Sequence, residues 1–487
     1  MQGLTSHPTG LSSETNCLLV RHAQSEKFMS RKRKETLCLF VLLLTTSRLS
    51  FAADAATVTL TPPQMRDDLV YLRDVWAPLD KSFSPEDRKS FDDIVATAIR
   101  NVDNLTPTEF ALAVGRATAT AHNGHTLAAL QSWPGFHGLP FKAYWFKDGL
   151  YIVRAHPQYA DLLGARIEQF GPLTPETALQ RVTPYISGTP ARVRDLSPSY
   201  LRLLEVLRRI GATSSDRYVN VRIVARDGKT RTVTLGSEPN PDPEGLSPSQ
   251  QPLKGLSDSP IPGRWLDVLD PVSHLPPSYG PPVDISSQWL STDKGILYLR
   301  STQIVDSAGE KPLWMKMQEI FYHDVLDEYE HVRPRYVIVD LRFNSGGNFL
   351  ETVLVSKSIP RILPENGRVF VLVGPGTFSA ALVTAAMLKG TGGGRVVLIG
   401  DTMGDAPQFW SEGREMALPN SQIWVEPATA YHDWANGCDD ASRCYWANVA
   451  FAVKNVSLAP EIQIIPTFSE YAAGLDPVLD KALSLAR

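Results

Sequence analysis

The sequence predicts a mixed α/β fold whose chemistry lies at the carboxyl ends of parallel strands. Three short runs rich in Val and Ile begin at Tyr336, Arg368 and Arg395, and each ends in Gly or polar turn residues. Segments of helix length separate the runs. This order is typical of buried parallel strands joined by crossover helices. Because such sheets bind ligands where their strands end, the turns after the runs hold the candidate site.

Two of these turns carry groups suited to acyl transfer. Gly346 and Gly347 follow the first run, and residues without Cβ let backbone N–H groups approach a ligand closely, as an oxyanion hole requires. Ser379 follows the second run, before small and apolar residues that begin at Ala380. A serine at a helix start lies at the positive end of the helix dipole, which favours a nucleophile. The alternative is that Ser379 only caps the helix.

These turns resemble motifs of the tail-specific, or C-terminal-processing, protease family of serine peptidases. Its Asp-Leu-Arg-x-Asn-x-Gly-Gly segment is matched by residues 340–347, and its Thr-x-Ser-Ala segment by residues 377–380. A Gly-Glu-x-Thr-x-Gly segment is matched less well by residues 400–404, and a Pro-Asp-Ile segment by residues 460–462. The resemblance is strongest from residue 285 onward, and the four motifs together are specific.

The resemblance implies an α/β catalytic domain of the ClpP/crotonase-like type, built from stacked ββα units. It implies Ser379 as the nucleophile and a polypeptide as the substrate, with no cofactor. The predicted oxyanion hole consists of the backbone N–H groups of Gly346, Gly347 and Ala380.

The chain divides into six expected segments. These are a mis-assigned extension (1–28), a signal peptide (29–55), an N-terminal helical segment (57–135), a PDZ-like module with a helical insertion (139–236), a Pro-rich connector (237–284) and the catalytic domain (285–487). The PDZ-like assignment comes from the resemblance, and modules of this type take extended peptides as an added strand. Within this module, Asp227-Gly228 between two alternating runs predicts a β-hairpin.

The N-terminal region has the pattern of an export signal. A basic cluster follows Met29, and an apolar run over residues 37–44 precedes small residues around Ala53. This run is too short to span a bilayer. We therefore expect translation to start at Met29, and the mature protein to begin near Ala53 to Thr57, without a membrane span, in the periplasm or outside the cell.

Cysteine usage agrees with export. Cys438 and Cys444 are separated by five residues, and in an oxidising compartment this pair predicts a disulfide. Closing so small a loop stabilises the fold by about 2 kcal/mol. Only His432 lies nearby, so we expect no metal site. The net charge of −4 gives no indication of nucleic-acid binding.

The general base is the weakest part of the motif match. In the best-known members a lysine follows the Thr-x-Gly segment, whereas Asp405 stands here. An ionised carboxylate beside an oxyanion repels the developing charge, so we expect Asp405 to matter little. Asn123-Gly124-His125-Thr126 resembles an Asp-Gly-His-Thr segment whose histidine is the base in a Ser-His-acid branch of the family. His125 is therefore the predicted base, and the alternative is a turn histidine.

The acid that would orient the base stays open at this point. Relatives with a triad carry a glutamate where this chain has Lys454. Asp433 and Glu412 are the nearest acidic candidates in sequence, and His432 is a rival base. The alternative for the segment around His432 is that its aromatic residues pack the disulfide loop.

Two hypotheses of different class follow. The first is an exported serine endopeptidase that cleaves polypeptides through an acyl-enzyme at Ser379. The second is a peptide-binding protein that keeps the fold without catalysis, as Asp405 and Lys454 at two motif positions would allow. A fluorophosphonate probe that labels reactive serines discriminates between them.

Overall fold

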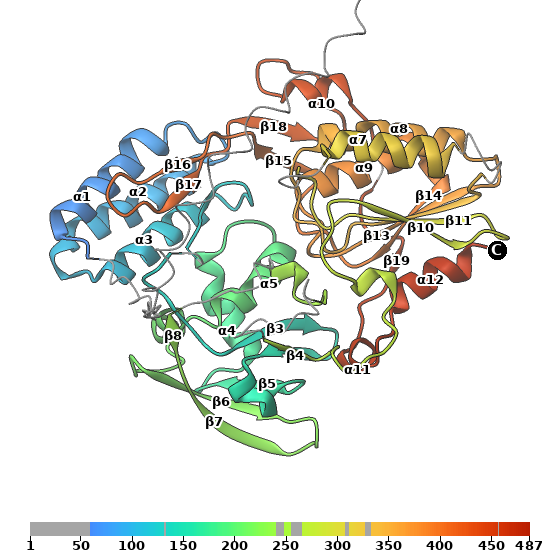
Figure 1. The fold of residues 1–487 in the computed structure, drawn as a ribbon. Helices are drawn as coiled ribbons and strands as arrows, with labels where there is room; N and C mark the ends of the chain where they lie inside the picture. The colour runs from blue at the N-terminus through green and yellow to red at the C-terminus, as the bar shows by residue number, and fades with distance from the viewer. Residues whose placement is uncertain are drawn as a thin grey trace, which may run out of the picture. The chain divides into compact units, whose positions relative to one another are not determined.

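The computed structural model describes residues 59–130, 133–239, 248–254, 265–306, 311–326, 333–455 and 457–487. These residues belong to one compact unit, which spans residues 55–487 (Figure 1). The predicted extension and signal peptide lie outside the described residues. Within the described part of the chain, no helix has the length and apolar character needed to cross a membrane.

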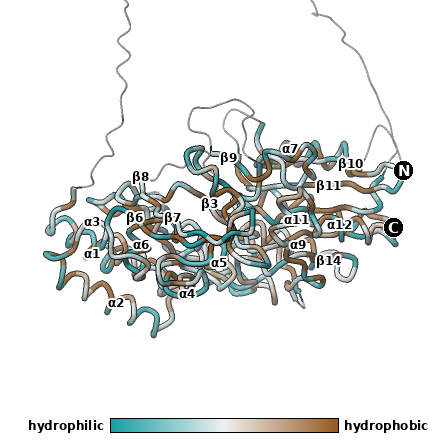
Figure 2. The backbone as a smooth tube through the Cα atoms, turned by 90° about the horizontal axis from the view of Figure 1, so that it is seen from below, coloured by the Kyte–Doolittle hydropathy of each residue, from teal (hydrophilic) through white to brown (hydrophobic). Residues whose placement is uncertain are grey.

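Three helices form the N-terminal segment. They are α1 (Pro62–Tyr71), α2 (Pro85–Arg100) and α3 (Pro107–Ala119). Each begins in the same way, with a Ser or Thr whose side chain accepts a backbone N–H and a proline at the first helical position. Hydrophobic and hydrophilic stretches alternate along α2 (Figure 2). Phe91, Val95 and Ala98 lie on its apolar side and are buried in the core.

The middle of the chain forms an antiparallel sheet. Its strands are β3 (Phe141–Phe146), β4 (Gly149–Ala155), β5 (Arg166–Phe170), β6 (Tyr218–Val224) and β7 (Thr230–Gly236), in that spatial order. Helices α4 (Pro175–Val182), α5 (Pro190–Tyr200) and α6 (Leu204–Arg209) are inserted between β5 and β6. The pairing of Val224 with Thr230 confirms the hairpin predicted at Asp227-Gly228. The sheet shares one hydrophobic core with the N-terminal helices.

The C-terminal part of the chain contains a six-stranded sheet. Its spatial order is β10 (Ser286–Ser291), β11 (Ile296–Arg300), β12 (Tyr336–Asp340), β13 (Arg368–Val373), β14 (Val396–Gly400) and β19 (Ile462–Gln463). All neighbouring pairs are parallel except β10 with β11. The predicted parallel strands are therefore confirmed, and β10 is an additional strand that the sequence analysis did not identify.

Helices cover both faces of this sheet (Figure 1). On one face lie α7 (Leu313–Ile320), α8 (Val353–Ile362) and α9 (Ala380–Gly392), and on the other lies α12 (Pro477–Leu485). Successive strand residues point to opposite faces of the sheet: Val337 packs with α7 to α9, and Ile338 packs with α12. Burial on both faces explains the uninterrupted apolar runs. A short helix, α11 (Phe468–Ala472), precedes α12.

Residues 401–455 leave the six-stranded sheet and return to it. They include β15 (Gln408–Ser411), β16 (Met416–Ala417), β17 (Trp424–Glu426), β18 (Ala430–Asp433) and α10 (Trp446–Ala450). β17 pairs with β1 (Leu127–Ala128), which directly follows α3 and its turn. This pairing joins the N-terminal segment to the C-terminal part. Cys438 and Cys444 form the predicted disulfide in the same region.

The predicted connector carries little regular structure in its described part. It contains β8 (Glu238–Pro239) and β9 (Leu266–Asp267), of which β9 pairs with β4. A buried ion pair fixes it to the middle sheet, because Nε of Arg154 lies 2.8 Å from Oδ2 of Asp267.

Candidate active site

Ser379 occupies the turn between β13 and α9 in an unusual backbone conformation. Its φ is 54° and its ψ is −124°, and α9 begins at the next residue. A residue with a Cβ pays about 1–3 kcal/mol for such a conformation, which persists only where the surroundings impose it. The Ser379 side chain makes no capping hydrogen bond to α9. A simple capping role therefore does not account for this serine.

Gly346 makes room for Ser379. Its φ is 104°, and a Cβ built at this position would lie 2.6 Å from Cβ of Ser379. Its backbone N–H donates to Oδ1 of Asn344 at 2.9 Å. The Gly346 amide is thus occupied within its own turn, which argues against its predicted role as an oxyanion donor. Gly347, with a φ of 132°, and Ala380 keep that role as candidates.

Asn344 ties the two turns of the site together, and sequence reasoning gave it no role. Its side chain is fully buried, and its Nδ2 donates to Oγ of Ser301 at 2.8 Å. Its backbone carbonyl accepts the N–H of Phe378 at 3.1 Å. The signal was present, because Asn344 belongs to the 340–347 motif.

His125 lies in this site because β1, two residues later, pairs with β17. Its Nε2 is 3.1 Å from Oδ2 of Asp405, and its Nδ1 is 3.2 Å from Oγ of Ser411. The rings of Phe378 and Phe409 stack against it, with centroid distances of 4.6 Å and 5.1 Å. The residue before Ser379 therefore touches the imidazole directly. The expectation that Asp405 matters little is not supported, because this carboxylate is the acid at His125.

His432 lies nearby but is bound differently. Its ring stacks on Phe409, with centroids 4.6 Å apart. Nε1 of Trp434 donates to its Nδ1 at 3.3 Å, and its Nε2 lies 3.3 Å from Oε1 of Glu412. Burial lowers the pKa of His432, although Glu412 acts in the opposite direction. An indole N–H can only donate, so the unprotonated nitrogen of His432 is already used and is unsuited to a general base.

The remaining acidic candidates lie away from His125. Asp433 accepts from Nε2 of Gln408 at 2.7 Å and from the backbone N–H of Asn436 at 2.8 Å. Oε1 of Glu412 lies 3.3 Å from Nε2 of His432 instead. Lys454, at the position of the glutamate in relatives with a triad, is exposed. The structure thus places Gly346 against Ser379, and His125 against Phe378, the residue before Ser379. Asp433 and Glu412 have other partners.

A buried cation from the middle part of the chain also reaches the site. The guanidinium carbon of Arg192, on α5, lies 4.0 Å from the ring centroid of Phe378. Its Nη1 is 3.6 Å from Oδ2 of Asp195. Burial raises the pKa of Asp195 to about 6, and Arg192 acts against this rise. Sequence reasoning gave neither residue a role, since α5 lies nearly 190 residues before Ser379.

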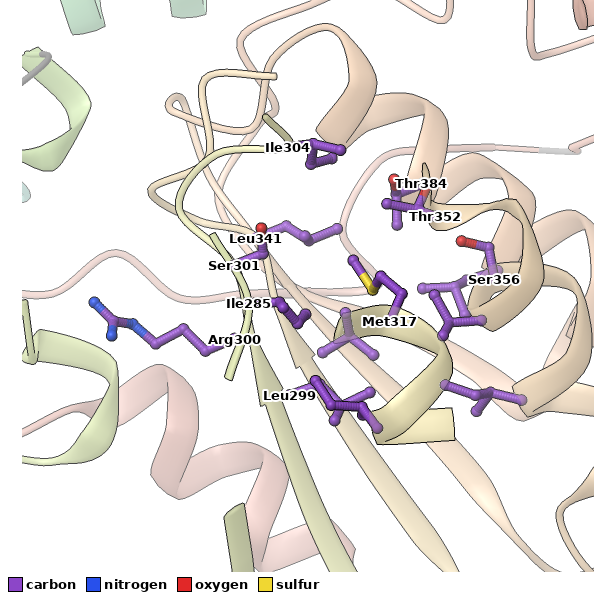
Figure 3. Close-up of a pocket in the computed structure, with 15 residues that line it drawn as sticks. Ile285, Leu299, Arg300, Ser301, Ile304, Met317, Leu341, Thr352, Ser356 and Thr384 are labelled. Atoms are coloured by element: carbon purple, nitrogen blue, oxygen red, sulfur yellow. Dashed lines mark hydrogen bonds between the residues drawn. The ribbon is translucent and has the colours of Figure 1, made fainter. Parts of the chain in front are cut away.

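A small apolar cavity lies between the six-stranded sheet and helices α7 to α9 (Figure 3). Its volume is about 30 Å³, room for little more than one water molecule. Thr352 and Thr384 on its wall bond to each other at 2.7 Å. Its size excludes a peptide side chain of any length, so it belongs to the core. Among the described residues, no group of three or more His, Cys, Asp or Glu is arranged to hold a metal ion.

The chain shares its fold with mature CPAF. It is similar to mature CPAF complexed with lactacystin, with a TM-score of 0.54 and 12% identity over 88% of this chain and 98% of that one. It is also similar to mature CPAF, with a TM-score of 0.53 and 13% identity over 88% and 97% of the two chains. The photosystem II D1 C-terminal processing protease aligns with a TM-score of 0.36 and 14% identity, over 86% and 97%. No family model and no curated protein matches the sequence.

Proposed function

We propose that this protein is a serine-type peptidase that cleaves polypeptides through an acyl-enzyme on Ser379. One observation carries the proposal: Ser379 keeps a strained backbone at a helix start, and its hydroxyl does not serve the helix. Strain of this kind gathers at active sites, and an exposed nucleophile on a sharp strand-to-helix turn is a known device of serine hydrolases. The motifs at residues 340–347 and 377–380, which resemble those of tail-specific proteases, support the same class.

The proposed reaction uses Ser379, His125 and two backbone N–H groups. Oγ of Ser379 attacks the carbonyl carbon of the substrate while its proton passes to the imidazole of His125. The backbone N–H groups of Gly347 and Ala380 stabilise the tetrahedral oxyanion. The imidazolium then protonates the leaving amine, and the acyl-enzyme forms. Water repeats the sequence, with its proton first taken up by His125 and then returned to Ser379.

The first test is labelling by a fluorophosphonate probe, followed by peptide mapping. We expect the label on Ser379, no label in Ser379→Ala, and a loss nearly as large in His125→Ala, because members of such a unit act together. Ser356→Ala is the control, since Ser356 lies in the cavity of Figure 3 and outside the site. A folded wild-type protein that takes up no label would instead favour the peptide-binding alternative.

The pH dependence of labelling separates His125 from the alternative bases. With a histidine as base, the rate rises with pH through the range in which histidines titrate. A profile that rises only at the alkaline end, as for an ammonium base, contradicts this assignment. Retained activity in His125→Ala together with lost activity in His432→Ala would move the role to His432.

We also propose that the protein is exported after removal of a signal peptide that starts at Met29. The basic and apolar segments after Met29 support this proposal. N-terminal sequencing of protein from the native host is expected to give a start near Ala53 to Thr57. A mature form that still contains Arg21 and His22 contradicts it.

A further inference from the structure

We propose that Asp405 and Ser411 are positioning residues that fix the tautomer of His125, so that Nδ1 is the nitrogen that takes the proton from Ser379. This inference rests on the proposed function. The arrangement reverses the usual serine protease geometry, in which the acid binds Nδ1 and the serine faces Nε2. It also gives Asp405 a task that its position in the motif, where relatives carry lysine, does not indicate.

The first step concerns Asp405. Its carboxylate is buried, and its Oδ1 accepts the backbone N–H of Ala406 at 3.0 Å. Its Oδ2 faces Nε2 of His125 at 3.1 Å. An ionised carboxylate only accepts hydrogen bonds. The ring proton of neutral His125 therefore resides on Nε2, and the lone pair resides on Nδ1.

The second step concerns Ser411. A hydroxyl donates or accepts, according to its rotation. With His125 neutral, Oγ of Ser411 donates to Nδ1 at 3.2 Å; with His125 charged, the same oxygen accepts from Nδ1–H. The Ser411 backbone is fixed in β15, where it pairs with Ala430 of β18. Ser411 thus tolerates both protonation states at one position.

The third step is that the ring has no freedom to turn. Phe378 and Phe409 cover its two faces at interplanar angles of 25° and 20°, and the two nitrogens are held at the edges. In the described structure, neither ring nitrogen is hydrogen-bonded to Ser379. Such contacts often form only when the substrate is bound. With the ring proton on Nε2, Nδ1 carries the lone pair of the neutral ring and is the nitrogen that can accept the proton of Ser379.

His432 provides an internal comparison. It has the same order of partners, with an acid at Nε2 and a donor at Nδ1, but its donor is the indole of Trp434. An indole cannot accept, so protonation of Nδ1 would place two N–H groups against each other. A hydroxyl in one case and an indole in the other explain why His125 is suited to shuttle protons and His432 is not.

Other charged groups around His125 belong in the design of the test. Glu426 on β17 interacts electrostatically with His125, as does His432 on β18. Arg192 on α5 is in electrostatic contact with Asp405. These groups are left unchanged in every variant, so that a shift in a pH profile reports on Asp405 or Ser411 alone.

The decisive measurement is independent of turnover. Nitrogen NMR of the full protein with labelled histidine separates a protonated from an unprotonated ring nitrogen, and His125→Gln assigns the two signals. We expect a protonated Nε2 and a bare Nδ1 when His125 is neutral. A protonated Nδ1 overturns the inference. Because this result does not depend on Ser379, it distinguishes failure of the tautomer assignment from failure of the peptidase proposal.

Kinetic variants give the second line of evidence. Asp405→Asn removes the charge that stabilises the imidazolium, and its amide no longer dictates the tautomer. We expect kcat to fall by about 100-fold or more with KM nearly unchanged, and the acid limb of kcat/KM to move to lower pH. Asp401→Asn, a carboxyl in the same loop and away from His125, is the matched control. Unchanged kcat and an unmoved acid limb in Asp405→Asn contradict the role.

Ser411 is tested by rescue. Ser411→Ala removes the hydroxyl and is expected to lower kcat by about 10-fold without a change in KM, whereas Ser411→Thr keeps the hydroxyl and restores most of the rate. A merely structural role predicts that Thr, which adds a methyl group to a buried site, is worse than Ala. A lower kcat in Ser411→Thr than in Ser411→Ala would contradict the assignment of Ser411.

Discussion

Nε2 of His125 lies 3.1 Å from Oδ2 of Asp405, although the two residues are 280 positions apart in the sequence. The pairing of β1 with β17 brings the N-terminal segment to the C-terminal part, and the loop after β14 supplies the carboxylate. In the motif comparison, Asp405 counts as the loss of a lysine. In the fold it is the partner of a histidine.

The close approach of Gly346 to Ser379 gives the first prediction. Gly346→Ala would place a Cβ 2.6 Å from that of Ser379, at a φ of 104° that disfavours any side chain. We expect the rate of fluorophosphonate labelling to fall at least about 100-fold, since small displacements of reacting groups cost this much. Circular dichroism checks that the fold is retained.

Gly228→Ala is the matched control for that experiment. Gly228 also has a positive φ, 78°, but no atom lies within 4 Å of a Cβ built there. Its substitution costs about 1 kcal/mol of backbone strain and should leave labelling unchanged. Equal loss of labelling in both variants would show that general destabilisation, rather than displacement of Ser379, is the cause.

Asp195 gives a prediction about pH and stability. Burial raises its pKa from 3.8 to about 6, so the folded state holds a proton that the unfolded state releases. Below about pH 4, protonated Asp195 contributes about 3 kcal/mol to the free energy of unfolding. This contribution falls as the pH rises towards about 6 and does not change further at higher pH. Asp195→Asn should lack this decline.

Chemical denaturation at several pH values between 4 and 8 tests this prediction. Loss of the ion pair with Arg192 changes the absolute stability of the variant, but it does not produce a slope in this window. The exposed Asp216→Asn serves as the control and should follow the wild type. Parallel curves for the wild type and Asp195→Asn would contradict the assignment.

The core cavity gives the next prediction. Oγ of Ser356 is buried on its wall without a hydrogen-bond partner among the described residues. Removing an unsatisfied hydroxyl from an apolar site is favourable, so Ser356→Ala is expected to raise the free energy of unfolding by about 1 kcal/mol. Ser197, also fully buried, accepts from Trp145 and donates to the carbonyl of Arg194.

Ser197→Ala is therefore the contrasting variant and should lower stability by about 1–2 kcal/mol. Denaturant midpoints of the two variants decide the matter. If both substitutions shift stability in the same direction, the hydrogen-bond account of the cavity is wrong.

The disulfide gives the last prediction. Replacing Cys438 and Cys444 by Ser is expected to lower the free energy of unfolding by about 2 kcal/mol, because the bond restricts the unfolded chain. A reductant should destabilise the wild type by a similar amount and leave the double variant unchanged. Two free thiols in the unreduced, denatured mature protein would contradict the bond itself.

The sequence by itself determined the elements whose signals are local. Runs of Val and Ile buried on both faces of a parallel sheet need no distant partner to be recognised, and neither does the turn at Asp227-Gly228. The placement of Ser379 at a strand-to-helix turn was predictable for the same reason. The periodicity of the side chains and the turn residues carry this information within a few positions.

Only the tertiary structure decided which groups meet at the site. Asp405, Asp433 and Glu412 are similar as residues, and their roles differ because the path of residues 401–455 carries one to His125 and another to His432. The occupied amide of Gly346 likewise depends on the fold of its own turn. A hydrogen bond forms within about 3 Å, and whether residues hundreds of positions apart come that close is set by how sheets and helices pack, not by local sequence.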